Sequence, residues 1–154
     1  MAFTVRQAAE SDIKALEKFQ QKSTDYVRPF DPTLKKKGRI EYYKVSDLMK
    51  SKKVLLLIVE KDGKIVACGY GEIKDSPHFM EEKQFGYVGF MFVLEEFRRQ
   101  GISKLILDEL FQWFRKKKIK DVTLKTYSKN TYAIKSYEKY GFRPMVTAMH
   151  ARIK

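Results

Sequence analysis

The strongest constraint in this sequence is the run from Phe85 to Leu94, in which the phenol of Tyr87 is the only polar side-chain group. In a strand, successive side chains point to opposite faces. The two resulting sets are both apolar: Phe85, Tyr87, Met91 and Val93 on one face, and Val88, Phe90, Phe92 and Leu94 on the other. A strand of this kind must be covered on both sides. We therefore expect it to be the middle strand of a sheet that lies between helices.

The residues after this strand predict how it connects to the next one. A turn containing Gly101 leads into a segment whose apolar residues share one broad helical face: Leu105, Ile106, Leu110, Trp113 and Phe114. Val122, Leu124 and Thr126 then alternate as a further strand. A strand, a helix and a second strand in this order form a crossover unit, so the two strands should be parallel.

The first half of the chain predicts an antiparallel hairpin. Two strand-like runs, Lys53 to Glu60 and Lys64 to Ile73, are separated by the Asp62-Gly63 pair that is typical of tight turns. Three further elements are expected before the hairpin: a strand over Thr4–Ala8, a helix capped by Ser11, and a helix over Leu34–Met49.

The end of the chain predicts one more helix and one more strand. Asn130 can cap a short helix that Gly141 ends, and Met145 to Ile153 then supplies a last strand. These elements together indicate a mixed α/β fold. Because no segment has the composition of a linker, we expect one domain over residues 1–154.

Composition narrows the class of protein. The 154 residues are 44% apolar and 14% aromatic, which excludes an intrinsically disordered chain. The longest aliphatic run, Val54 to Val59, is six residues, far too short to span a membrane. The N-terminus has no secretion signal, and the single cysteine, Cys68, cannot form an internal disulfide. We therefore expect a cytoplasmic protein with no membrane partner.

The net charge of +13, from 32 Lys and Arg against 19 Asp and Glu, should attract anions in general. The lysine clusters are typical of solvated turns and helix ends, and no zinc-binding or RNA-binding motif accompanies them. Nucleic acid is therefore an unlikely partner, and a nucleic-acid or ribosome-associated module is an alternative to the leading hypothesis.

The turn before the long helix is a candidate phosphate site. A strand that leads into a helix through Gly101 leaves the first helical N–H groups free to bind phosphate, and Arg98 and Arg99 add positive charge. The turn has neither the GxGxxG of a dinucleotide fold nor the GK[ST] of a P-loop. These residues alone leave the ligand open.

Two motifs resemble those of one family. The segment VLEEFRRQGIS, Val93 to Ser103, is similar to the pyrophosphate loop of the GNAT superfamily of acyl-CoA-dependent N-acyltransferases, [QR]-x-x-G-x-[GA]. Arg98 and Gly101 match, whereas Ser103 stands where the family has Gly or Ala. The segment from Asn130 to Phe142 resembles the family's N-x-x-A-x-x-x-Y-x-x-x-G-F pattern.

This resemblance implies a GNAT fold: a central mixed, mostly antiparallel sheet with a splayed parallel strand pair, flanked by about four helices. It also implies that acetyl-CoA is the co-substrate, bound between Met91–Val93 and Thr123–Tyr127, with no metal. The acetyl group would pass to a primary amine of a small molecule or protein by direct attack in a ternary complex. Homodimers are frequent in the family.

The resemblance also assigns roles to residues. The expected cofactor-binding residues are Met91, Phe92, Val93, Arg98, Arg99, Gln100, Gly101, Ile102, Ser103 and Asn130. Tyr137 matches the tyrosine that gives a proton to the departing sulfur, with Tyr140 as its nearest rival. The general base has no family match here, so Glu72 is the leading choice, with Glu41 and His78 left open. A non-catalytic acyl-CoA-binding regulatory domain, lacking a working base, is the second alternative.

Overall fold

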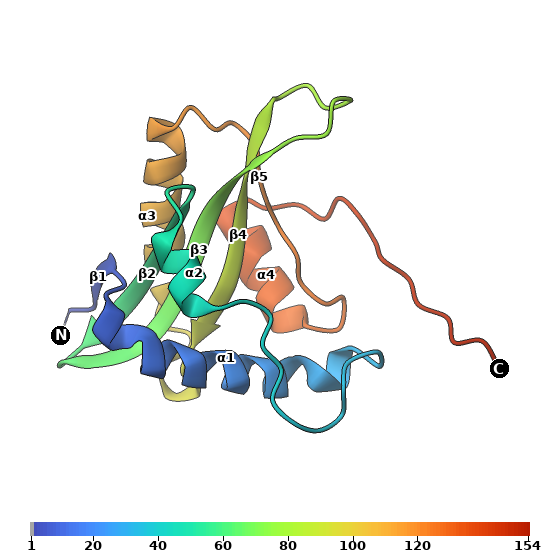
Figure 1. Cartoon of the computed structure of the whole chain (residues 1–154), viewed down its shortest axis with the longest axis horizontal. Helices are drawn as coiled ribbons and strands as arrows, with labels where there is room; N and C mark the ends of the chain where they lie inside the picture. Colours follow the sequence, from blue (N-terminus) through green and yellow to red (C-terminus); the bar gives the residue numbers. More distant parts are fainter. Residues whose placement is uncertain (1) are drawn as a thin grey trace.

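A five-stranded sheet forms the centre of the structure, a computed structural model that describes residues 2–154 (Figure 1). The strands lie in chain order: β1 (Thr4–Gln7), β2 (Val54–Lys61), β3 (Lys64–Asp75), β4 (Gln84–Val93) and β5 (Val122–Leu124). Neighbouring strands pair antiparallel except β4 and β5, which are parallel. The mixed sheet confirms the predicted fold class and the predicted crossover between β4 and β5.

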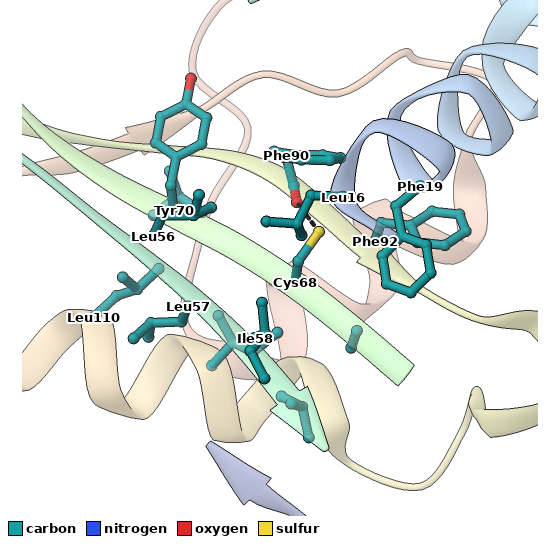
Figure 2. Close-up of a cluster of buried hydrophobic side chains, with 14 of the residues drawn as sticks. Leu16, Phe19, Leu56, Leu57, Ile58, Cys68, Tyr70, Phe90, Phe92 and Leu110 are labelled. Atoms are coloured by element: carbon teal, nitrogen blue, oxygen red, sulfur yellow. Dashed lines mark hydrogen bonds between the residues drawn. The ribbon is translucent and has the colours of Figure 1, made fainter. Parts of the chain in front are cut away.

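Helices cover both faces of the sheet. On one face lie α1 (Ile13–Val27) and α2 (Val45–Lys50), and on the other α3 (Ile102–Lys116) and α4 (Thr131–Tyr140). The shorter 3-10 helices are η1 (Glu10–Asp12), η2 (Arg28–Phe30) and η3 (Glu95–Phe97). Figure 2 shows both layers of the core, with Leu16 and Phe19 of α1 on one side of the sheet and Leu110 of α3 on the other. Within residues 2–154, no helix is long and apolar enough to span a membrane.

The helix α3 approaches the sheet closely because glycines lie beneath it. A Cβ atom at Gly71 would lie 2.9 Å from the ring of Phe114, and one at Gly86 would lie 2.7 Å from the same ring. Phe114 itself is fully buried. The two glycines therefore make the space for the largest side chain between α3 and the sheet.

The turn between β2 and β3 forms as predicted. Asp62 has φ of 52° and Gly63 has φ of 75°, so both residues adopt the left-handed conformation that a two-residue hairpin of this type requires.

The strand predicted to lie in the middle of the sheet, β4, lies one position nearer the edge. The middle of the sheet is β3, and β4 lies between β3 and the edge strand β5. The predicted assignment of side chains to the two faces of the strand is also wrong after Gly89. There β4 contains a bulge, in which Phe90 and Met91 together lie opposite Gly69 of β3. Beyond the bulge the odd and even positions exchange faces, so Phe92 packs on Phe19 of α1 while Met91 faces α3.

The start of α1 differs from the prediction because Asp12, not Ser11, organises it. A 3-10 turn precedes α1, and the Asp12 carboxylate accepts the Ala9 N–H at 2.7 Å. The same carboxylate accepts a hydrogen bond from Arg6 at 2.7 Å, and Arg6 also donates to Glu60 at 2.6 Å. The Arg6 guanidinium holds the pKa of Asp12 below its usual range.

The helix expected over Leu34–Met49 forms only at its end, as α2. Three consecutive lysines, followed by Gly38 at φ of 89°, interrupt helical structure before it. The loop is held instead by two glutamines of α1: Gln21 donates to the Ile40 carbonyl at 2.8 Å, and Gln20 accepts the Tyr42 N–H at 2.7 Å.

The last strand expected over Met145–Ile153 is not part of the sheet. Residues 143–154 are all exposed and have no helix or strand structure. Figure 1 shows this segment, in red, extending away from the rest of the molecule. We call residues 143–154 the C-terminal tail.

Candidate functional site

The two parallel strands pair over only part of β4, and we call its unpaired stretch opposite residues 125–127 the gap. Their pairing is limited to Gly86–Val88 with Val122–Leu124, after which β5 ends while β4 continues to Val93. Beyond this point the β4 edge that faces residues 125–127 has no strand beside it within the part of the chain described. An extended ligand can pair with such an edge as an added strand. The gap lies where the sequence predicted the pantetheine arm, beside Met91 and Val93.

The bulge in β4 lies at this gap. Phe90 has φ of 51°, a conformation that costs energy for a bulky residue and is concentrated at functional sites. Its carbonyl oxygen accepts a weak hydrogen bond from the Cys68 thiol at 3.5 Å, drawn as a dashed line in Figure 2. A Cβ atom at Gly69 would lie only 2.4 Å from the Met91 sulfur, so glycine there leaves room for the bulge.

The turn after β4 has the properties of an anion site. Arg99 and Gly101 both have left-handed φ, 63° and 78°, and no side chain caps the start of α3. The first N–H groups of a helix have no acceptor within the helix, and its dipole places positive charge there. A Cβ atom at Gly101 would meet no atom within 4 Å, so a side chain at this position would extend into open space. The residues of the turn therefore fit a diphosphate.

The two arginine side chains of this turn contact neighbouring parts of the protein. Arg98 donates to the Val93 carbonyl at 3.0 Å, and its guanidinium lies 5.0 Å from the centre of the Tyr26 ring in α1. Arg99 lies 5.7 Å from the ring centre of Tyr132 in α4. These contacts tie the turn to helices on both faces of the sheet.

The remaining residues predicted to bind the cofactor differ in how exposed their side chains are. Phe92 and Ile102 are buried in the core, so only their backbone groups are available to a ligand. Gln100 and Gly101 are exposed and Ser103 is half-buried. Asn130 caps α4, with its side-chain oxygen accepting the Ala133 N–H at 3.3 Å.

Tyr137 lies on α4 and is partly buried, with its ring 5.8 Å from that of Phe142. Burial, with a smaller contribution from nearby Tyr87, raises the pKa of Tyr137 to about 12. Its rival Tyr140 is already engaged, because its hydroxyl donates to Asp108 at 2.8 Å. Of the two, Tyr137 is the phenol whose hydroxyl does not already donate to a carboxylate.

Glu72 belongs to the same neighbourhood. It pairs with Tyr87 across β3 and β4, and the rings of Tyr70 and Tyr87 are 6.3 Å apart. Burial raises the pKa of Tyr70 to about 12 and also raises the pKa of Tyr87, and the negative charge of Glu72 adds to both shifts. Glu72 is thus the cross-strand neighbour of Tyr87, whose phenol also contributes to the raised pKa of Tyr137.

Glu41 and His78 are the two other candidates for the general base. Glu41 is exposed and lines a hollow together with Glu17, Gln20 and Tyr43. His78 is exposed in the loop between β3 and β4, beyond the Asp75–Gln84 pair that ends their ladder. Within residues 2–154, no three His, Cys, Asp or Glu side chains are grouped as they would be around a metal ion.

The sequence analysis missed three tyrosines of this region. Tyr70 and Tyr87 were read only as strand residues, although a phenol within an otherwise apolar strand is a signal of a polar site. Tyr127 was seen only as part of the second parallel segment. Its hydroxyl donates to Asp31 at 2.7 Å and so holds the loop after β5 against the end of α1 and η2.

Comparison with known proteins agrees with this geometry. Residues 15–142 match the family model described as the acetyltransferase (GNAT) family. The chain is a GNAT acetyltransferase. The two sequence motifs that resemble this family, Val93–Ser103 and Asn130–Phe142, lie within the matched range.

Solved structures share the GNAT fold over nearly the whole chain. A mutant of the BH1408 protein from Bacillus halodurans is 17% identical, with a TM-score of 0.87 over 98% of this chain and 99% of that one. A predicted acetyltransferase from Clostridium acetobutylicum, solved with acetyl-CoA, is 17% identical, with a TM-score of 0.72 over 98% and 96%. An aminoglycoside antibiotic 6′-N-acetyltransferase from Acinetobacter haemolyticus is 15% identical, with a TM-score of 0.72 over 98% of each chain. A search of curated protein sequences finds no match.

Proposed function

We propose that this GNAT acetyltransferase transfers the acetyl group of acetyl-CoA to a primary amine, by direct attack in a ternary complex. The observation that carries the proposal is the gap, the stretch of β4 without a partner strand opposite residues 125–127, which begins beside a bulge and is followed by an uncapped helix N-terminus. An extended arm with a diphosphate at one end matches that surface. The whole chain, residues 1–154, acts as one domain in this proposal.

Backbone groups do most of the cofactor binding in this proposal. Those of Met91 and Val93 pair with the pantetheine arm, and those from Arg99 to Ser103 bind the diphosphate. Arg98 keeps the two sites in register, because its hydrogen bond to the Val93 carbonyl joins the strand to the turn. Preorganised amides of this kind also stabilise the charge that develops on a thioester oxygen.

The reaction needs two proton transfers, and two groups near Tyr87 are suited to them. The amine nitrogen forms a bond to the thioester carbon, and the bond from that carbon to sulfur breaks. Glu72 takes the proton that the amine loses, through water, and Tyr137 donates a hydrogen bond and then a proton to the departing thiolate. A phenol with a pKa of about 12 keeps its proton at neutral pH, so it is ready to donate.

The face that carries Glu72 favours a cationic acceptor. Tyr43 lies 5.9 Å from Tyr70 and 5.2 Å from Phe90, measured between ring centres, so this face of β3 and β4 carries a group of aromatic rings. Aromatic faces and a carboxylate both attract an ammonium group. The acceptor is an amine of a small molecule or protein.

The proposed location of the enzyme is the cytoplasm. Cys68 is a buried free thiol, which suits this reducing compartment.

Calorimetric titration with acetyl-CoA tests the proposal, using wild type, Gly101→Glu and Tyr137→Phe. Wild type and Tyr137→Phe should bind alike, while Gly101→Glu should bind at least about 100-fold more weakly, because its carboxylate occupies the phosphate space. Gly63→Glu is the matched control, since Gly63 has nearly the same φ and is equally open but lies in the β2–β3 turn. It should bind like wild type.

Release of CoA in the presence of a panel of amines separates the remaining possibilities. Turnover with any primary amine supports the proposed reaction. Tight binding of acetyl-CoA without turnover would favour the regulatory domain, and no binding at low or high salt would overturn the cofactor assignment.

A further inference from the structure

We infer that the hydroxyl of Tyr70 binds the acceptor amine and makes the enzyme select primary amines, because it accepts a hydrogen bond from the N–H group that the amine keeps. The assignment rests on the proposed acetyl transfer, and it gives Tyr70 a part in a reaction so far carried by Glu72 and Tyr137. Neither of those two residues distinguishes a primary amine from a secondary one, since each handles a single proton.

The ring of Tyr70 lies directly over Gly89 of β4. The two residues pair across β3 and β4. A Cβ atom at Gly89 would lie 2.5 Å from the Tyr70 hydroxyl oxygen, so glycine leaves the room that the phenol occupies. Gly89 is the first residue of β4 beyond its pairing with β5, which ends at Val88, and it directly precedes the bulge at Phe90. The Tyr70 hydroxyl therefore lies where the gap begins.

The side chain of Tyr70 is buried, but the protein does not use its hydroxyl. Tyr70 is 7% exposed. Within residues 2–154 its hydroxyl has no hydrogen-bond partner, whereas those of Tyr127 and Tyr140 donate to Asp31 and Asp108. No buried side-chain nitrogen or oxygen of the described residues lacks a partner, so the Tyr70 oxygen reaches solvent. Figure 2 shows this oxygen, in red, pointing away from the labelled apolar side chains. It is available to a ligand.

Tyr70 and Glu72 lie on the same face of the sheet. They are two positions apart on β3, and side chains at that spacing point to the same side of a strand. Burial, with smaller contributions from Tyr87 and Glu72, raises the pKa of Tyr70 to about 12. The phenol therefore stays neutral at neutral pH, and its oxygen can accept a hydrogen bond.

A neutral primary amine has one lone pair and two N–H groups, and each has a place at this site. The lone pair attacks the thioester carbon, and one N–H loses its proton through water to Glu72. The other N–H donates to the Tyr70 oxygen and remains in the amide product, so Tyr70 neither gains nor loses a proton. A secondary amine has a single N–H and leaves one of the two acceptors unpaired, which lowers its reactivity.

Kinetics with two matched amines test the assignment. The probes are the primary amine of the panel that the wild type acetylates fastest and the N-methyl derivative of the same compound. Tyr70→Phe should lower kcat/KM about 30-fold for the primary amine and less than about threefold for the N-methyl derivative, because the lost hydrogen bond is to a nitrogen that becomes positively charged. The selectivity should therefore fall about tenfold. Tyr42→Phe removes a phenol at the edge of the same group of rings, 6.3 Å from Tyr43, and should keep the wild-type selectivity.

Gly89→Ala tests the position of the hydroxyl rather than its presence. The added Cβ atom displaces the Tyr70 ring, so this variant should also lose selectivity although it keeps the phenol. The affinity of Tyr70→Phe for acetyl-CoA, measured by calorimetry, should change less than about twofold.

The outcomes separate the role of Tyr70 from the proposed function. If Tyr70→Phe binds acetyl-CoA but keeps the wild-type selectivity, or loses activity equally with both amines, the role of Tyr70 is overturned and the acetyl transfer stands. Unchanged selectivity in Gly89→Ala would also overturn it. A wild type that binds no acetyl-CoA, or that acetylates no amine, would overturn both.

Discussion

Tyr137 illustrates how burial can prepare a side chain for a single role. Its phenol has a pKa of about 12, raised mainly by burial, so it carries a proton over the whole range in which an enzyme works. Such a group can donate a hydrogen bond to a thiolate but cannot act as a base at neutral pH. The direction of the pKa shift therefore fits an acid role and excludes the opposite one.

Replacing Tyr137 with Phe should lower kcat about 100-fold, because the departing sulfur loses its donor, while the affinity for acetyl-CoA changes less than about twofold. Steady-state kinetics with calorimetry measures both quantities. Tyr140→Phe, on the same helix, removes a phenol that is bonded to Asp108 and should keep nearly full activity. Equal losses in the two variants would contradict the assignment.

Replacing Glu72 with Gln should also lower kcat about 100-fold, because a neutral amide cannot accept the proton of the amine. The same change at Glu41, which is exposed and lies in the loop before α2, serves as the control. If the Glu41 variant loses activity and the Glu72 variant keeps it, Glu72 is not the general base and Glu41 takes that role.

At the scale of elements, the contact between α3 and the sheet makes a stability prediction. Gly86→Ala places a Cβ atom 2.7 Å from the Phe114 ring and should lower the free energy of unfolding by about 2 kcal/mol. Phe114→Leu should relieve this clash, so the double variant should lose less than the sum of the two single losses in urea denaturation. Simple additivity would show that the sheet adjusts without strain.

The start of α1 makes a prediction about acid stability. The pKa of Asp12 is lowered in the folded state, so its pairing with Arg6 adds stability that is fully present above the ordinary Asp pKa of about 4 and is lost as the pH falls through the folded value. Asp12→Asn should therefore cost about 2 kcal/mol at pH 7 and progressively less below pH about 4. Asp47→Asn, on the exposed side of α2, should change little at either pH.

The sequence allowed most elements to be predicted where local pattern decides structure. The hairpin at Asp62-Gly63, the crossover through α3 and the helix between Asn130 and Gly141 all follow from residues close together in the chain. The bulge at Phe90 could not be predicted, because it depends on Gly69 in a neighbouring strand leaving room for Met91. For the same reason the faces of β4 and the cluster around Glu72 became clear only in the structure.

The C-terminal tail shows where sequence pattern was not sufficient to predict the structure. Its alternation predicted a strand, but these residues form no strand in the structure, because alternation alone does not supply a partner edge within reach. Similarly, the weak helical pattern before α2 could not reveal that Gln20 and Gln21 hold that segment as a loop. The sequence likewise left the acceptor open, since the residues on that side carry no recognised motif.

At the scale of the whole molecule, the net charge of +13 predicts salt dependence. Because CoA carries several phosphate charges, the dissociation constant of acetyl-CoA should rise severalfold as ionic strength increases across the range in which the Debye length falls from about 10 to about 3 Å. The kcat at saturating acetyl-CoA should change little. A kcat that falls as steeply as the affinity would place the effect of salt on the reaction itself.

Two contacts join α1 and the residues just after it to the segments that follow β4 and β5: Arg98 lies over the ring of Tyr26, and the Tyr127 hydroxyl donates to Asp31. In the proposed reaction, the end of α1 therefore helps to position the segments expected to hold the cofactor. An attempt to engineer a new acceptor preference by changing Tyr26 or Asp31 would alter cofactor affinity as well. Positions on β3 and β4, such as Tyr70 and Tyr87, offer a way to redesign selectivity that avoids this penalty.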